Sequence, residues 1–240
     1  MKKILLSVVV VMFLSAAAGQ AADPLSDLIK GLKLPTASGG LDNDTIVSGL
    51  KESLTVGTGK AVTSVSKLDG YFANQMIKIL MPEQIQKVAD LAGKFGYQKQ
   101  VDEFVLSMNR AAEKAAPQAK NYFIEAIKQM TFEDAKKIWQ GSDTAATEYF
   151  KAKTSDKLYT AFKPTISKSM DQVGTTHAYK EMMGKFTAIP FMNAESVDLD
   201  HHVTNKALDG LFYMVGQEEK NIRTNPAART TDLLKKVFWK

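Results

Sequence analysis

The chain has 240 residues, with 31 basic and 26 acidic residues and no cysteine. Without cysteine it can neither form disulfides nor carry a cysteine-linked lipid, so burial of apolar side chains has to hold any folded domain together. Charges of both signs are interspersed, whereas nucleic-acid-binding proteins gather Lys and Arg on one face. We therefore exclude nucleic acid as a partner, while a weak attraction to anionic membrane surfaces stays open.

The N-terminus has the three parts of a secretory signal. Lys2 and Lys3 precede an apolar run from Ile4 to Leu14, and small residues follow it. This run is much shorter than the roughly 20 residues that a helix needs to cross a bilayer. We predict a signal peptide over residues 1–21, cleaved near Ala21, export to the periplasm, and no transmembrane segment after cleavage.

Residues 22–40 are rich in proline and glycine and are predicted to form a flexible leader before a helical domain over residues 41–240. The first helix is expected to start at Asp42 or Asp44, because either aspartate can cap it. Residues 68–82 are less regular and predict an extended loop or one short strand.

The clearest predicted helix runs from about Gln100 to Ala116. Its apolar residues recur every three or four positions, and those in its second half are alanines, which predicts a close helix–helix crossing. Pro117 is expected to break or kink the chain before a helix over residues 122–130.

Thr131 and Asp134 have the spacing of a capping box, which opens a short predicted helix that Gly141 ends. Ser142 or Asp143 is expected to cap the next helix. We predict that Thr154 or Ser155 begins a further helix, kinked at Pro164 and ending at Gly174.

A long helix is predicted from Asp198 or Asp200, and its apolar residues cover more than one face, as in a central helix. Asn225 and Pro226 separate it from a last helix containing Leu233 to Phe238. No segment alternates as a strand does, so the predicted class is all-α. The predicted architecture is a single compact multi-helix bundle with a long central C-terminal helix and short capped helices.

Five blocks of residues carry a resemblance to a known family. They are Asp69–Phe72 (DGYF), Met108–Pro117 (MNRAAEKAAP), Ala145–Thr147 (AAT), Lys206–Phe212 (KALDGLF) and Glu219–Phe238 (EKNIRTNPAARTTDLLKKVF). In this order they resemble the bacterial family catalogued as domain of unknown function 4197. The resemblance covers about Leu41 to Phe238 and implies an exported protein without an assigned activity. Asp200-His201-His202 departs from the family pattern, so a role for these histidines would be peculiar to this chain.

Two segments resemble parts of metal or cofactor sites. Asp198, Asp200, His201 and His202 supply four possible metal ligands within five residues, but capping by the aspartates explains the pattern without a metal. We therefore favour no metal site. The segment Gly57–Lys60 (GTGK) lacks the other residues of a phosphate-binding loop, and we predict no cofactor.

Polar residues inside or beside the family blocks are the candidate ligand-binding residues. They are Asn109, Arg110, Glu113, Asp209, Glu218, Glu219 and Arg223. They could line a ligand site at a helix junction, or they could form a partly buried network of ion pairs and caps that fixes helix packing. No catalytic residue is predicted.

We interpret the chain as a non-enzymatic periplasmic protein that binds an apolar or lipid-like ligand, or a partner protein of the envelope, between its helices. The alternatives are a carboxylate-based enzyme such as a hydrolase, acting near Glu113, Asp209 and Glu218, and a metal-handling protein at Asp198 to His202.

Overall fold

The computed structural model describes residues 42–172 and 197–238. No strand occurs within these ranges, and the predicted all-α class is confirmed. The predicted signal peptide and leader, the helix end at Gly174 and the looser segment around Ile189 lie outside the described residues. The helices are α2 (Asn43–Ser66), α3 (Glu83–Ala92), α4 (Gln98–Ala115), α5 (Ala119–Gln129), α6 (Phe132–Gln140), α7 (Ala145–Gln172), α9 (Leu199–Thr224) and α10 (Asp232–Phe238). Short turns of other helix types are η1 (Gly93–Tyr97), η2 (Ala116–Gln118) and η3 (Pro226–Ala228).

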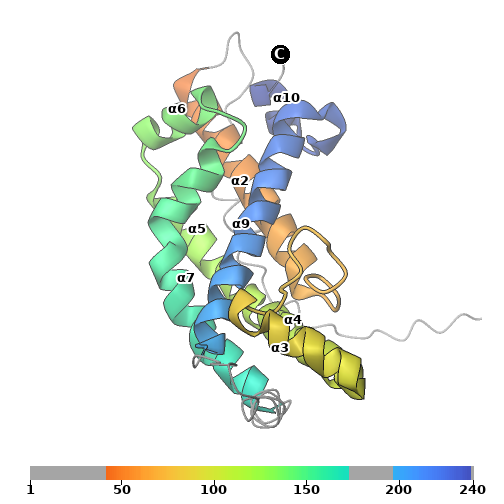
Figure 1. Ribbon diagram of the computed structural model, residues 1–240. Coiled ribbons are helices and arrows are strands. Elements are labelled where there is room, and N and C mark those ends of the chain that lie inside the picture. The colour runs from red at the N-terminus through yellow and green to blue at the C-terminus, as the bar shows by residue number, and fades with distance from the viewer. Residues whose placement is uncertain (1–41, 173–196, 239–240) are drawn as a thin grey trace, which may run out of the picture.

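Three long helices, α2, α7 and α9, form the body of the bundle (Figure 1). The α3–α4 hairpin crosses one end of this body, and α6 and α10 lie at the other end. Because α9 packs on α2, α4 and α7, it is the central helix that the sequence predicts. No helix in the described part of the chain is both long enough and apolar enough to cross a bilayer.

Local side-chain caps fix the starts of α2, α6 and α9. Asp42 caps α2 by accepting from the Thr45 N–H at 2.6 Å, and Asp198 caps α9 by accepting from the His201 N–H at 2.9 Å. The capping box predicted at Thr131 and Asp134 is present in both directions. These contacts satisfy backbone N–H groups that the first turn of a helix leaves without a partner.

One predicted boundary is wrong. Thr154 and Ser155 do not begin a new helix, because α7 continues unbroken through both residues. Thr154 is buried, and its hydroxyl donates back to the Phe150 carbonyl at 2.7 Å inside the helix. The fully buried side chains of Phe150, Leu158 and Phe162 continue one apolar stripe across the predicted break, and burial of that stripe outweighs the capping tendency of a threonine.

The alanine-rich half of α4 is buried, as predicted. Ala111, Ala112 and Ala115 are at most 1% exposed, and α4 packs closely on α7. Side chains this small allow two helix backbones to approach, which brings the polar residues of α4 close to their neighbours. Between α2 and α3, residues 67–82 form turns and extended backbone without a strand, which is one of the two predicted alternatives.

Candidate functional site

Asn109, at the centre of α4, holds the chain between α2 and α3. Its side-chain oxygen accepts from the Ile79 N–H, and its amide nitrogen donates to the Ile79 carbonyl, both at 2.8 Å. The same nitrogen donates to the Val105 carbonyl one helical turn earlier. Asn109 is fully buried. Its side chain satisfies both the N–H and the carbonyl of Ile79, as the backbone of a neighbouring strand would do in a sheet.

Glu113 and Arg110, also on α4, bind the turn that follows α2. One Glu113 oxygen accepts from the backbone N–H groups of Tyr71 at 3.1 Å and Phe72 at 3.3 Å, and the other accepts from Arg110 at 2.6 Å. Arg110 also donates to Asp69 at 2.6 Å. Burial lowers the pKa of Arg110, but the hydrogen bonds and charges of Glu113 and Asp69 outweigh burial and raise that pKa above its usual value.

The turn at Asp69 brings its backbone unusually close to the end of α2. Asp69 has a left-handed backbone with φ of 62°, and a Cβ on Gly70 would lie 2.6 Å from the Ser64 carbonyl oxygen. Only glycine fits there. Tyr71, which follows, is fully buried and donates from its hydroxyl to the Ala207 carbonyl of α9 at 2.7 Å. Burial and the Glu113 charge raise the pKa of this hydroxyl, so it stays protonated as a donor.

Glu219 and Arg223, on α9, bind the N-terminus of α7. The Glu219 carboxylate accepts from the N–H groups of Ala146 and Thr147 and from the Thr147 hydroxyl, each at 2.9 Å. Arg223 donates to Glu219 at 3.0 Å and to the Ile138 carbonyl at 2.7 Å. A carboxylate at a helix N-terminus is stabilised by the free N–H groups and by the helix dipole. The pair therefore joins α6, α7 and α9.

The other two candidate residues lie apart from these networks. Asp209 is exposed on α9 and pairs loosely with Lys206 at 3.8 Å. Glu218 faces α2, and one of its oxygens is buried without a hydrogen-bond partner. The structure thus brings together Asn109, Arg110 and Glu113 around residues 69–79, and separately Glu219 and Arg223. It does not bring Glu113, Asp209 and Glu218 into one cleft.

Three of the four metal candidates at the start of α9, Asp198, His201 and His202, contact different neighbours. The Asp198 side chain caps the helix, His201 contacts the Tyr159 hydroxyl at 2.7 Å, and His202 contacts the Leu80 carbonyl at 3.0 Å. Within the described ranges, no three His, Cys, Asp or Glu side chains are placed to hold one metal ion.

A cavity between the helices of residues 42–172 and 197–238 is small. It lies between α2, α7, α9 and α10, beside Glu219 and Arg223, and offers about 20 Å³ to a water molecule, which is room for about one. An acyl chain would not fit there without separation of the helices.

A long surface groove follows the outward face of α9, and we call it the α9 groove. It consists of three adjoining hollows of about 410, 670 and 550 Å³ that all include Asp209. Residues 76–86 form one wall, and the start of α7 forms the other wall further along. The side chains of Met76, Leu80 and Tyr213 in the largest hollow are exposed to solvent.

The comparisons with known proteins decide the family. A family model described as "Protein of unknown function (DUF4197)" matches residues 40–239. The chain belongs to the DUF4197 family. No curated protein and no solved structure matches the chain.

In this DUF4197 chain, the five blocks that carry the resemblance contact one another. Asp69–Phe72 is held by Arg110 and Glu113 of the second block, and Tyr71 of the first block binds Ala207 of the fourth. In the third block, the N–H groups of Ala146 and Thr147 donate hydrogen bonds to Glu219 of the fifth block. Of the seven candidate residues, only Asp209 lines the α9 groove.

Sequence reasoning missed the α9 groove and the structural role of Tyr71. A signal was present in residues 68–82, where large apolar residues occur without helical spacing. Such residues are either buried by a distant partner, as Tyr71 is, or displayed on the surface, as Met76 and Leu80 are. Periodicity alone does not separate the two outcomes.

Proposed function

We propose that this DUF4197 chain is an exported, non-enzymatic binding protein, and that the α9 groove holds a helical segment of a partner protein of the bacterial envelope. The observation that supports this most is the groove itself, with exposed Met76, Leu80 and Tyr213 beside polar walls. An amphipathic helix binds by laying its apolar face into a groove, and these three side chains would supply the apolar contacts.

The dimensions of the groove suit such a partner. It follows α9 from Asp198 to Lys220, and its α9 residues recur every three or four positions along one face. At 1.5 Å per residue this stretch is about 33 Å long, which corresponds to about six helical turns. The occupant would lie alongside α9 as a further member of the bundle.

A partner protein is favoured over a lipid-like ligand because the apolar side chains available for binding lie in a surface groove and not around an enclosed cavity. Lipid-binding sites enclose an apolar chain, whereas the interior cavity holds about one water. The largest hollow of the α9 groove carries charged residues of both signs, including Lys78, Glu83 and Lys206. These side chains can pair with the polar face of an amphipathic helix.

The arrangement of carboxylates does not favour the alternative of a carboxylate-based enzyme. Glu113 is occupied by Arg110 and two backbone N–H groups, and Asp209 lies on the opposite side of α9 from the hollow that Glu218 lines. Acid–base catalysis needs two such groups within reach of one substrate.

Photo-crosslinking in intact cells tests the proposal. A photo-reactive phenylalanine analogue replaces Tyr213 in the groove, and the same analogue replaces Phe132 in a control chain. Phe132 is an exposed aromatic residue at the start of α6, outside the groove. We expect a discrete adduct with a second polypeptide from position 213 and none from position 132.

Two outcomes would overturn the proposed function. Identical adducts from both positions would indicate random collisions, and an adduct of position 213 with lipid alone would assign the groove to a different ligand. Mass spectrometry of the adduct distinguishes lipid from peptide.

Export has its own test. After expression with the natural N-terminus in a bacterium with two membranes, we expect the chain in the periplasmic fraction with Ala22 as its first residue. Recovery of the chain with Met1 attached, in the membrane fraction, would contradict the proposed processing.

A further inference from the structure

The most exposed large apolar side chains of the described residues are concentrated in one stretch of sequence. Leu68 is 73% exposed, Met76 68%, Leu80 60% and Phe95 68%. The two next most exposed, Phe132 and Tyr213, reach only 40% and 36%. We call Leu68, Met76, Leu80 and Phe95 the apolar tips.

Two of the apolar tips stand on tight turns. Leu68 directly precedes Asp69, and Phe95 directly precedes Gly96, which has a φ of 89°. The first turn is fixed by the ion pair between Asp69 and Arg110. Both side chains are exposed to solvent on these turns.

Each apolar tip has a lysine within two positions along the chain. Lys67 precedes Leu68, Lys78 lies between Met76 and Leu80, and Lys94 precedes Phe95. The one acidic residue equally near a tip is Asp69, which pairs with Arg110. Apolar side chains with lysines beside them match a boundary where acyl chains meet anionic headgroups.

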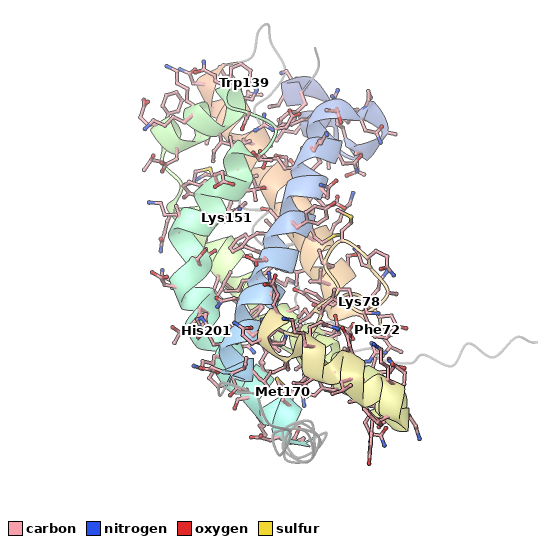
Figure 2. All side chains as sticks on the ribbon, viewed as in Figure 1. Phe72, Lys78, Trp139, Lys151, Met170 and His201 are labelled. Carbon is pink, nitrogen blue, oxygen red and sulfur yellow. The ribbon has the colours of Figure 1, made fainter. Side chains whose placement is uncertain are left out.

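The elements that bear the apolar tips project on one side of the bundle. In Figure 1 the α2–α3 connection and the free end of the α3–α4 hairpin both lie on the right, whereas α5 and α7 lie on the left. Figure 2 shows Phe72 and Lys78 on this same side, where the Lys78 ammonium lies 4.1 Å from the Phe72 ring centre.

We propose that this side of the molecule docks on the surface of an anionic membrane, with the apolar tips in the headgroup boundary and Lys67, Lys78 and Lys94 on lipid phosphates. A membrane fits better than a protein because the tips are separated along the chain, two of them stand on tight turns, and every tip has a lysine within two positions. This inference goes beyond the α9 groove, because Leu68 and Phe95 lie outside it. Met76, Lys78 and Leu80 line its largest hollow as well, so a membrane and a partner helix would compete for these three side chains.

Vesicle sedimentation tests the docking. The processed chain, from Ala22 onward, is mixed with vesicles rich in phosphatidylglycerol or made of phosphatidylcholine alone. We expect binding to the anionic vesicles that weakens at high salt, and at least tenfold weaker binding to the neutral ones. Leu68→Ser with Phe95→Ser should weaken binding on the order of tenfold or more, and each of Lys67→Gln and Lys94→Gln about fivefold.

The absence of cysteine provides a second readout. Phe95→Cys and, as a matched control, Phe132→Cys each give one thiol for a polarity-sensitive dye. We expect the dye at position 95 to shift to the blue on anionic vesicles and the dye at position 132 not to shift. All these substitutions are at exposed positions, and circular dichroism should show unchanged helix content.

Equal binding of the wild-type chain and the Leu68→Ser, Phe95→Ser variant would overturn the inference. So would equal dye shifts at positions 95 and 132, or no binding to anionic vesicles. Loss of the position-213 crosslink in the double variant, without any vesicle binding by the wild-type chain, would assign the apolar tips to a protein partner instead.

Discussion

Glu219 shows how one side chain can determine the position of several helices. Its side chain is 5% exposed and that of Arg223 is 12% exposed. Glu219 accepts from two N–H groups and the Thr147 hydroxyl of α7, and Arg223 donates to a carbonyl of α6. A glutamate and an arginine in a solvent-filled cleft could bind a ligand. Here each has partners within the protein, and the pair links helices.

Substitution of Glu219 should therefore affect folding strongly. Glu219→Ala leaves Arg223 and two N–H groups of α7 without their carboxylate, and we expect it to lower the free energy of unfolding by about 3–5 kcal/mol. The control is Glu148→Ala, which removes an exposed ion pair with Lys151 and should cost less than about 1 kcal/mol. Urea unfolding followed by circular dichroism measures both. Similar losses for the two variants would contradict the proposed role.

His202 links stability to pH. Burial lowers the pKa of His202 below its ordinary value of 6.5, and this outweighs the opposite effect of the Leu80 carbonyl, while Lys206 and His201 lower it further. Below about pH 6.5 the unfolded chain takes up a proton at this residue while the folded chain does not. The contribution of His202 is thus fully present above that pH and declines as the pH falls toward the folded-state pKa.

The variant His202→Gln isolates this effect, because glutamine can still donate to the Leu80 carbonyl but does not titrate. We expect the urea midpoint of the wild-type chain to fall more between pH 7.5 and pH 5 than that of the variant. Equal falls in both proteins would show that His202 does not couple to folding.

At the scale of elements, contacts local in sequence were predictable and contacts between distant segments were not. The capping box at Thr131 involves residues three apart, and the sequence alone identifies it. The Glu219 contact with the start of α7 spans more than 70 residues, and no spacing rule reports it. The error at Thr154 has the same origin, since burial against other helices overrides a local capping preference.

Tyr71 and Gly210 couple the α2–α3 connection to α9. A Cβ on Gly210 would lie 2.7 Å from the Tyr71 ring and 3.0 Å from the Ile77 Cβ. We expect Gly210→Ala to lower the free energy of unfolding by about 1–3 kcal/mol through overpacking.

Gly216, two turns further along the same helix, is the matched control. Its added Cβ would meet nothing closer than 3.5 Å, so Gly216→Ala should be neutral or stabilise by about 0.5–1 kcal/mol. Thermal unfolding of the two variants checks the contrast, and an equal change in both would contradict the close Tyr71 contact.

At the scale of the whole molecule, the sequence predicts the helical class and names most of the residues that join the helices. The sequence does not locate the α9 groove, because the groove lies between segments that are far apart in the chain, and sequence spacing does not show how those segments pack. Asn109 of α4 holds the Ile79 backbone, and the neighbouring Met76 and Leu80 line the largest hollow together with residues of α9.

In our proposal, shared polar residues such as Glu113 hold the helices together while the α9 groove binds the partner. The most direct measurement is the yield of the crosslink from position 213 in two variants, at a temperature where both are folded. Asp209→Trp places a bulky side chain where all three hollows of the α9 groove meet. Glu113→Gln weakens the hydrogen bonds that the Tyr71 and Phe72 N–H groups donate to α4. We predict that Asp209→Trp removes the adduct at an unchanged Tm, whereas Glu113→Gln lowers the Tm and keeps the adduct. Retention of the adduct in Asp209→Trp, with its loss in folded Glu113→Gln, would contradict the account.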